Sequence, residues 1–267
     1  MTRALSRRRL LSAGLVVGGA SLVAGDSVVR ATPALLRAEP RPAPSPSATP
    51  PPPPPTAPPM APLTQPVFTL AEYRKVVPGP DFPPNAVALT IDDGPHPMWT
   101  PKVLNLLERY HVPAMFCLIG NQVLGHEPLA RNVVSAGHQI ANHTWSHPAG
   151  IAGLSPEKVQ QEIDRAQEKI YDTTGQVPTV FRSPGGAVSP AVFAAAAQAR
   201  MTPVNWDADP RDWTKPGTGA IAQRLMAARP GDILLCHDGG GDRSQTCAAL
   251  STVIPALLAR GLQFVAL

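Results

Sequence analysis

The chain has 267 residues, 34 of them proline, and a formal net charge of +4. Residues 1–66 hold seven arginines and two acidic residues, a charge of +5, so subtraction from the total leaves −1 for residues 67–267. The excess of basic residues therefore belongs to the N-terminal quarter of the chain. Because the remainder lacks the basic surplus of nucleic-acid-binding proteins, we exclude nucleic acid as a partner.

The first 31 residues predict an export signal. Arginines at 7–9 precede an apolar run at 14–20, and small residues follow near Ala24. This order is typical of secretory signals, and adjacent arginines are typical of the twin-arginine type. The alternative is an uncleaved membrane anchor, although the apolar run is shorter than the ~20 residues of a spanning helix. We expect an exported protein, extracellular or associated with the cell wall.

Proline dominates residues 32–66, including an unbroken run from 50 to 55. Such a composition favours a semi-rigid polyproline II spacer, because it offers no apolar side chains for a core. We therefore predict a disordered linker over 32–66 and one folded domain over 67–267.

Apolar strands and helical stretches alternate in the predicted domain, which is typical of an α/β fold with a parallel sheet. An open doubly wound sheet and a closed barrel both fit this alternation. Seven units with polar residues at many strand ends favour a barrel. The expected strands are 87–91, 114–119, 139–141, 179–182, 203–206, 233–236 and 263–266, and the expected helices are 101–110, 127–136, 156–173, 190–200, 219–229 and 246–260.

Three cysteines occur in the predicted domain. Cys117 lies within an apolar strand pattern and is expected to be a buried thiol. Cys236 and Cys247 are the pair that could form a disulfide in an exported chain.

Two adjacent carboxylates, Asp92 and Asp93, end the first expected strand, where Gly94 and Pro95 break it. Parallel strands of α/β folds carry their chemistry at this end. Neighbouring strand residues point to opposite sides, so the two can reach different partners if the turn twists the chain. On its own, the tetrapeptide is equally compatible with a polar turn.

A second cluster, His143 to His147, follows the third expected strand. Histidines four residues apart stand on one face of a helical turn and can meet one cation. Together with a carboxylate from a neighbouring strand end they predict a three-ligand metal site with an open position for water. The remaining histidines are expected to be surface or structural residues: 96, 111, 126 and 138.

Three further polar clusters follow later strands. Arg182 could keep a buried carboxylate ionised and oriented, and the following glycines expose backbone N–H donors. Acids and a tryptophan within 207–213 could support a histidine and form an apolar wall. His237 ends a buried strand and suits general acid work near neutral pH.

Taken in order, these five clusters resemble the motifs of the polysaccharide deacetylases, the family-four carbohydrate esterases with a NodB-homology domain. The matching segments are Thr-Ile-Asp-Asp-Gly-Pro, His-Thr-Trp-Ser-His, Arg-Ser-Pro-Gly-Gly, Asp-Pro-Arg-Asp-Trp and Leu-Cys-His-Asp, within about residues 85–267. The resemblance implies a single-domain, distorted (β/α)7 barrel of parallel strands. It also implies metal-dependent removal of N- or O-acetyl groups from a polysaccharide.

The resemblance also implies a role for each motif residue. Gly185 stands where the family usually has an aromatic residue, so one substrate-contacting wall is absent, although the backbone N–H toward the oxyanion could remain. Cys236 replaces a more usual aliphatic residue. The implied roles are Asp92 as catalytic base, Asp93 with His143 and His147 as metal ligands, Arg182 as the tether of Asp92, His237 as general acid oriented by Asp212 or Asp209, and Trp213 with Leu235 as the acetyl-methyl pocket.

We expect one divalent metal, zinc by default, with cobalt or another divalent ion as alternatives. The predicted reaction is N-deacetylation of N-acetylglucosamine in peptidoglycan or chitooligosaccharide. The alternatives are an acetylxylan esterase and a glycan-binding module without catalysis. The expected partner is a polysaccharide, with membrane contact only through an uncleaved leader, and the expected state is a monomer.

Overall fold

The computed structural model describes residues 60–267. The predicted export signal and residues 32–59 of the predicted linker lie outside this range. Within the described residues, no helix combines the length and apolarity needed to cross a bilayer.

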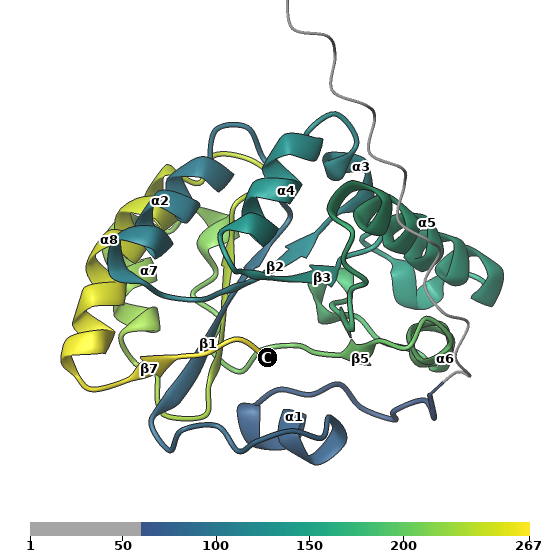
Figure 1. Cartoon of the computed structure of the whole chain (residues 1–267), viewed down its shortest axis with the longest axis horizontal. Helices are drawn as coiled ribbons and strands as arrows, with labels where there is room; N and C mark the ends of the chain where they lie inside the picture. Colours follow the sequence, from purple (N-terminus) through teal and green to yellow (C-terminus); the bar gives the residue numbers. More distant parts are fainter. Residues whose placement is uncertain (1–59) are drawn as a thin grey trace, which may run out of the picture. The chain divides into compact units, whose positions relative to one another are not determined.

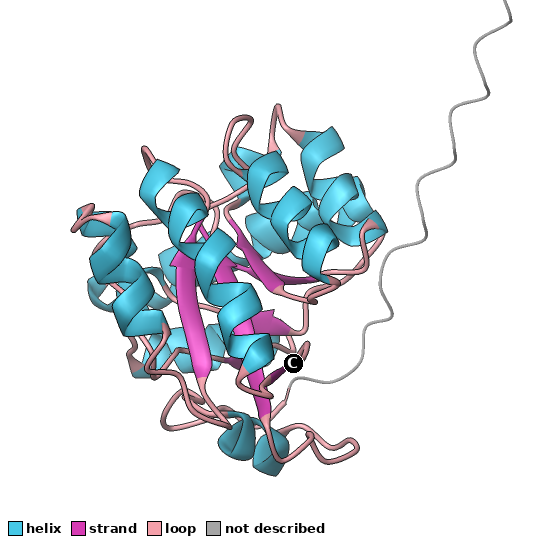
Figure 2. Ribbon diagram, turned by 90° about the vertical axis from the view of Figure 1, so that its left-hand side faces the viewer, coloured by secondary structure: helices cyan, strands magenta, loops and turns pink. Residues whose placement is uncertain are grey.

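The described residues form seven parallel strands (Figures 1 and 2). Their spatial order is β5-β4-β3-β2-β1-β6, and β7 pairs with the first residues of β1. Each strand begins within one residue of its expected start, and each ends within two residues of its expected end except β5, which ends three residues early. The bounds are β1 Ala86–Asp92, β2 Met115–Leu118, β3 Gln139–Asn142, β4 Val180–Phe181, β5 Thr202–Pro203, β6 Ile233–His237 and β7 Gln263–Phe264.

Helices surround the sheet (Figure 2). All six expected helices are present. Ser155, which directly precedes Pro156, caps α5: its side chain accepts the N–H of Lys158, and the helix ends at Gly175 with a φ of 71°. Two short helices, α1 and α3, were not expected. The bounds are α1 Leu70–Val76, α2 Thr100–Tyr110, α3 Gly120–Val123, α4 Glu127–Ser135, α5 Pro156–Thr174, α6 Pro190–Gln198, α7 Thr218–Leu225 and α8 Ser244–Ala259.

Alternate side chains of β1 enter two different apolar clusters. Residues 87, 89 and 91 pack outwards in a cluster that includes residues of α2, α4, α7 and α8. Residues 86 and 88 instead pack with Leu70 and Tyr73 of α1, which lies apart from the other helices (Figure 1). Thr90 and Asp92 share the face of residues 86 and 88, so both point to the interior of the curled sheet.

The curled sheet confirms the predicted distorted barrel, but strand pairing does not close it. β5 and β6 end the strand order, and isolated bridges join the two sides. Val67 bridges Val204 on one side, and Thr69 bridges Asp232 on the other. The short stretch before α1 therefore closes the barrel.

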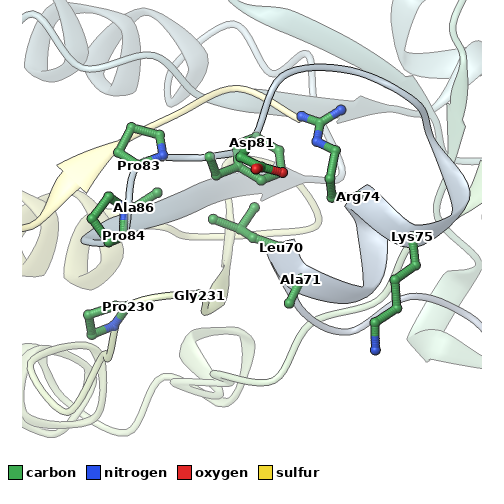
Figure 3. A pocket seen from close by; sticks show the side chains of 11 residues that line it. Leu70, Ala71, Arg74, Lys75, Asp81, Pro83, Pro84, Ala86, Pro230 and Gly231 are labelled. Carbon is green, nitrogen blue, oxygen red and sulfur yellow. The ribbon is translucent and has the colours of Figure 1, made fainter.

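Residues 60–66, the end of the predicted linker range, lie against this domain. The Met60 N–H donates to the Ala197 carbonyl oxygen at 3.0 Å, and Pro66 is buried. A cavity of about 480 Å³ lies at the N-terminal ends of β1 and β6, between α1, residues 81–86 and residues 230–231 (Figure 3). It occupies the strand ends opposite to the polar clusters.

All three described cysteines are free. Cys117 is a buried thiol, as expected, and Cys236 and Cys247, the pair that could have formed a disulfide, do not form one. Both side chains pack in the outer cluster as small apolar groups, and burial raises the pKa of Cys247 to about 11.

Candidate active site

Asp92 and Asp93 reach the same side of the sheet because Asp93 leaves the strand conformation. Asp93 has a φ of 76°, in the left-handed region, so its carboxylate turns back instead of pointing outwards. Two glycines make room for this turn. A methyl group on Gly239 would lie 2.0 Å from the Asp93 carbonyl oxygen, and one on Gly240 would lie 2.7 Å from Asp93 Oδ2.

Asp93, His143 and His147 form a candidate metal centre. Asp93 Oδ1 lies 3.4 Å from His143 Nε2 and 3.3 Å from His147 Nε2. One possible ligand atom from each residue lies within 4.8 Å of the other two, and no other such group of three was found among residues 60–267. The three predicted metal ligands therefore converge on one point.

The two histidines meet through a turn, so the predicted helical turn is wrong. Thr144 and His147 have φ values of 67° and 56°, outside the helical region. Side-chain hydrogen bonds hold this shape: the Thr144 N–H donates to Asn142 Oδ1 at 2.9 Å, and the His147 N–H donates to Thr144 Oγ1 at 3.0 Å. A spacing of four is also compatible with such a turn, which brings the imidazole centroids of His143 and His147 to 4.9 Å.

The atoms of this centre fit a cation. The Nδ1–H of His143 donates to the Arg182 carbonyl oxygen at 2.7 Å, so Nε2 is the nitrogen that faces Asp93. Asp93 Oδ1 is buried and accepts no hydrogen bond. Burial acts to raise the pKa of Asp93, but the His143 imidazole and then His237 and His147 hold this pKa below its usual value. A buried anionic oxygen that faces two imidazole nitrogens is a donor set suited to a divalent metal.

Arg182 follows β4, has no exposed surface and fixes Asp92. Its Nη1 donates to Asp92 Oδ1 at 2.9 Å and to Thr90 Oγ1 at 2.6 Å. The rest of the guanidinium is held by backbone carbonyl oxygens: Nε donates to Val204 at 3.1 Å and Nη2 to Asn205 at 2.9 Å. The other carboxylate oxygen, Asp92 Oδ2, lies 3.7 Å from His143 Nε2, beside the candidate metal centre.

His237 ends β6 directly beside Asp92, since the two residues are paired in register. Its Nδ1 lies 2.7 Å from Asp212 Oδ1, and its backbone N–H donates to Asp212 Oδ2 at 2.9 Å. Thr246 Oγ1 donates to that second oxygen at 2.8 Å. Asp209, the other acid considered, is exposed and accepts the N–H of Arg211 instead. Asp212 is thus the acid that contacts His237.

The ion pair raises the pKa of His237. Burial acts to lower this pKa, but the hydrogen bond that the imidazole donates to Asp212 and the charge of Asp212 outweigh burial, so the pKa lies above the ordinary value of histidine. Because Asp212 occupies Nδ1, the atom free to exchange a proton is Nε2.

The three expected substrate-contacting residues occupy the same strand ends. Leu235 on β6 is 2% exposed and is paired in register with Thr90. Trp213 directly follows Asp212 and is 50% exposed. Gly185 is exposed, has a φ of 60°, and has open space within 4 Å of where a side chain would begin.

Sequence reasoning missed four residues that hold the site in place. Thr90 could have been found, since strand alternation puts it on the face of Asp92. Asn142 lies only two residues before its partner Thr144, so the sequence places it beside the histidine cluster. Asn205 and Thr246 lie 23 and 34 residues from their partners, and only the fold brings them together.

Comparisons with known proteins agree with this geometry. Residues 79–204 match the family described as "Polysaccharide deacetylase". A peptidoglycan-N-acetylglucosamine deacetylase of Bacillus cereus is 42% identical over 182 residues, 67% of this chain and 84% of that protein. A chitooligosaccharide deacetylase of Bradyrhizobium sp. (strain ANU 289) is 41% identical over 191 residues, 67% of this chain and 87% of that protein.

The fold is also similar to solved structures. The crystal structure of a peptidoglycan N-acetylglucosamine deacetylase in complex with 4-naphthalen-1-yl-N-oxidanyl-benzamide aligns with a TM-score of 0.68 and 29% identity. The alignment covers 75% of this chain and 90% of that structure. The sequence match, the curled parallel sheet and the converging motif residues lead to one conclusion: the chain belongs to the polysaccharide deacetylase family.

Proposed function

We propose that this protein is a metal-dependent hydrolase that removes N-acetyl groups from N-acetylglucosamine units of peptidoglycan or a chitin-type polysaccharide. The observation that carries the proposal is the placement of Asp92 and His237 beside the Asp93–His143–His147 centre. The relatives named for peptidoglycan and chitooligosaccharide deacetylation support this choice of substrate.

Asp93, His143 and His147 would hold the cation. When bound, a divalent metal would polarise the acetyl carbonyl and lower the pKa of a coordinated water. We propose zinc, because two imidazoles, one carboxylate and an open position are typical of catalytic zinc. Cobalt and other divalent ions fit the same donor set.

Asp92 acts as the base in this proposal. Arg182 occupies Asp92 Oδ1, so Oδ2, the oxygen beside the candidate metal centre, is available to take a proton from the attacking water. The hydroxide oxygen forms a bond to the acetyl carbon. The backbone N–H of Gly185 is proposed to donate to the developing oxyanion, a role that needs no side chain.

His237 acts as the general acid. Its Nε2 donates a proton to the sugar nitrogen as the bond from that nitrogen to the acetyl carbon breaks, which releases acetate and a free amine. Asp212 keeps the imidazole protonated and oriented for this step. Trp213 and Leu235 are proposed to enclose the acetyl methyl group.

We further propose that the protein is exported through its twin-arginine-like segment and acts as a monomer. The basic and apolar pattern of residues 1–31 supports export. The proline-rich range 32–59 would then separate the domain from its point of attachment.

An Asp92→Asn variant tests the proposal. The amide cannot accept the proton, so acetate release from N-acetylglucosamine oligomers or peptidoglycan should fall by about 10³-fold or more, since a general base contributes roughly 10²–10⁴-fold. Metal content should stay near that of the unmodified protein. Metal loss with retained activity would exchange the roles of Asp92 and Asp93.

A substrate panel separates the alternatives. Acetate released from acetylated xylan, but not from N-acetylated glycans, would indicate an esterase. Glycan binding without acetate release from any substrate by metal-loaded protein would indicate a binding module.

A further inference from the structure

Two buried side chains that the mechanism does not use, Thr100 and Asp238, join two parts of the site. Both have 0% exposed surface. Thr100 Oγ1 donates to Asp238 Oδ2 at 2.5 Å and accepts the N–H of His96 at 2.7 Å. The bond spans 138 residues of sequence, from the start of α2 to the end of β6.

Asp238 contacts both neighbours of the metal ligand Asp93. Its backbone N–H donates to the carbonyl oxygen of Asp92 at 3.0 Å. Its Oδ1 lies against Gly94, where an added methyl group would be only 2.4 Å away. Asp238 also directly follows His237, so one residue borders the base, the metal ligand and the acid.

The loop from Asp93 to Trp99 is held from the other side as well. The carbonyl oxygen of Gly94 accepts the N–H of Ile119, which follows β2, at 3.0 Å. Asp93 itself has a left-handed backbone, a conformation that persists only where the surroundings enforce it. The hydrogen bonds accepted by the carbonyl oxygens of Asp92 and Gly94, on either side of Asp93, can enforce this conformation.

We propose that Thr100 and Asp238 are a positioning pair that fixes the loop 93–99 against the strand end of His237, and thereby sets the ligand geometry of Asp93. Neither residue touches the substrate or the reacting atoms. The consequence for turnover rests on the proposed function, whereas the consequence for metal affinity does not.

A comparison of Thr100→Val with Thr100→Ser tests the pair. Valine keeps the size of threonine but removes the oxygen, which leaves the His96 N–H and the Asp238 carboxyl without their partner. Serine keeps the oxygen. Titration of Zn²⁺ into metal-free protein should show a dissociation constant about tenfold higher for Thr100→Val, since outer contacts of metal ligands typically contribute 10–100-fold. Thr100→Ser should stay within about twofold of the unmodified protein.

Thr174→Val is the matched control. Thr174 Oγ1 donates to the Ile170 carbonyl oxygen at the far end of α5, so the same substitution removes a hydrogen bond outside the site. Zn²⁺ affinity should not change in this variant. With saturating Zn²⁺, Thr100→Val should also lower kcat for acetate release by about tenfold with KM changed by less than about twofold.

A purely structural pair would give a different result. If Thr100→Val lowered only the thermal midpoint, and left the Zn²⁺ dissociation constant and kcat like those of the control, the proposal would be overturned. If the unmodified protein bound Zn²⁺ but released no acetate, the proposed function would fail, and the titration would still test the pair. An Asp238→Ala variant should reproduce the change in Zn²⁺ affinity, and should it fail to fold, the Thr100 variants still decide.

Discussion

At the scale of single residues, neighbours in the sequence have separate tasks because one of them departs from the strand. Asp92 keeps strand geometry and faces Arg182, whereas Asp93 adopts a φ of 76° and faces the two histidines. Such a backbone in a non-glycine residue costs of the order of 1–3 kcal/mol and is characteristic of functional sites. The doublet therefore directs one carboxylate to Arg182 and the other to His143 and His147, which matches the base and the metal ligand of the proposed function.

The ion pair of His237 predicts a shift in the pH profile. With His237 as the proposed general acid, activity depends on its protonated form and should fall as the pH rises through its pKa. In Asp212→Asn the carboxylate that raises this pKa is gone, whereas burial, which lowers it, remains. The alkaline limb of kcat against pH should therefore move to lower pH, in addition to a lower maximum. Initial rates of acetate release between about pH 5 and 10 measure this shift. If the alkaline limb of Asp212→Asn stays where it is in the unmodified protein, the limb reports the titration of a group other than His237.

Substitution of Gly185 by alanine should lower stability without lowering activity. An alanine at a φ of 60° should cost roughly 1 kcal/mol of unfolding free energy, whereas its methyl group would meet no atom within 4 Å. The backbone N–H remains, so kcat should change little. Urea denaturation and acetate release on Gly185→Ala check both parts. Lost activity at unchanged stability would show that the space beside Gly185 is needed by the substrate.

At the scale of elements, Arg182 connects β4 to β1 and to the segment after β5. Its four hydrogen bonds reach two side chains and two backbone carbonyl oxygens without any contact with solvent. A planar guanidinium can direct its donors to several partners at once, which an ammonium cannot. Arg182 therefore fixes the position of the C-terminal end of β1, which carries Asp92, relative to the segment after β5 that contains Asn205.

Arg182→Lys should lower the unfolding free energy by about 1–3 kcal/mol for each buried acceptor left unsatisfied, because one ammonium group cannot reach all four acceptors of the guanidinium. Acetate release should be lost with it. Arg260→Lys is the matched control, since Arg260 also donates to backbone carbonyl oxygens but is exposed. Denaturant titrations of both variants give the comparison. If the two variants lost similar amounts of unfolding free energy, burial of the Arg182 guanidinium would not be the reason for its contribution to stability.

Much of this arrangement follows from the sequence, because apolar alternation marks the strands and C-terminal ends of parallel strands share one edge. The seven strands and the positions of Asp92, His143 and His237 were predictable on that basis. The short helix α1 was not, although its Thr69–Glu72 capping box is visible in the sequence. Spacing alone could not separate a helical turn from the hydrogen-bonded turn at Thr144.

The choice between Asp209 and Asp212 also needed the fold. Both acids lie within one short cluster, and a shift of three residues decides which one meets the imidazole. The backbone at Arg211 is left-handed, with a φ of 55°. Arginine rarely adopts this conformation, so the sequence does not predict it. Contacts across the barrel, such as Thr246 with Asp212, arise only once distant segments are packed.

At the scale of the whole molecule, metal binding should stabilise the domain. The ligands come from the end of β1 and from the turn after β3, so a bound cation joins two segments of the folded state that separate on unfolding. A metal at 1,000 times its dissociation constant adds about 4 kcal/mol. Thermal denaturation with Zn²⁺ and with chelator should differ accordingly. The difference should vanish in Asp93→Ala, and its persistence there would place the metal elsewhere.

The closure of the barrel by residues 67–69 has a consequence for limited proteolysis and for aggregation. Val67 donates to the Pro203 carbonyl oxygen and accepts the N–H of Asn205, so its removal would leave unpaired backbone groups at a sheet edge. Exposed edges of this kind recruit strands from other molecules. A protease that trims the chain before residue 60 should leave a soluble enzyme, whereas a cut after Thr69 should yield self-associating material. Size-exclusion chromatography of the two products distinguishes them.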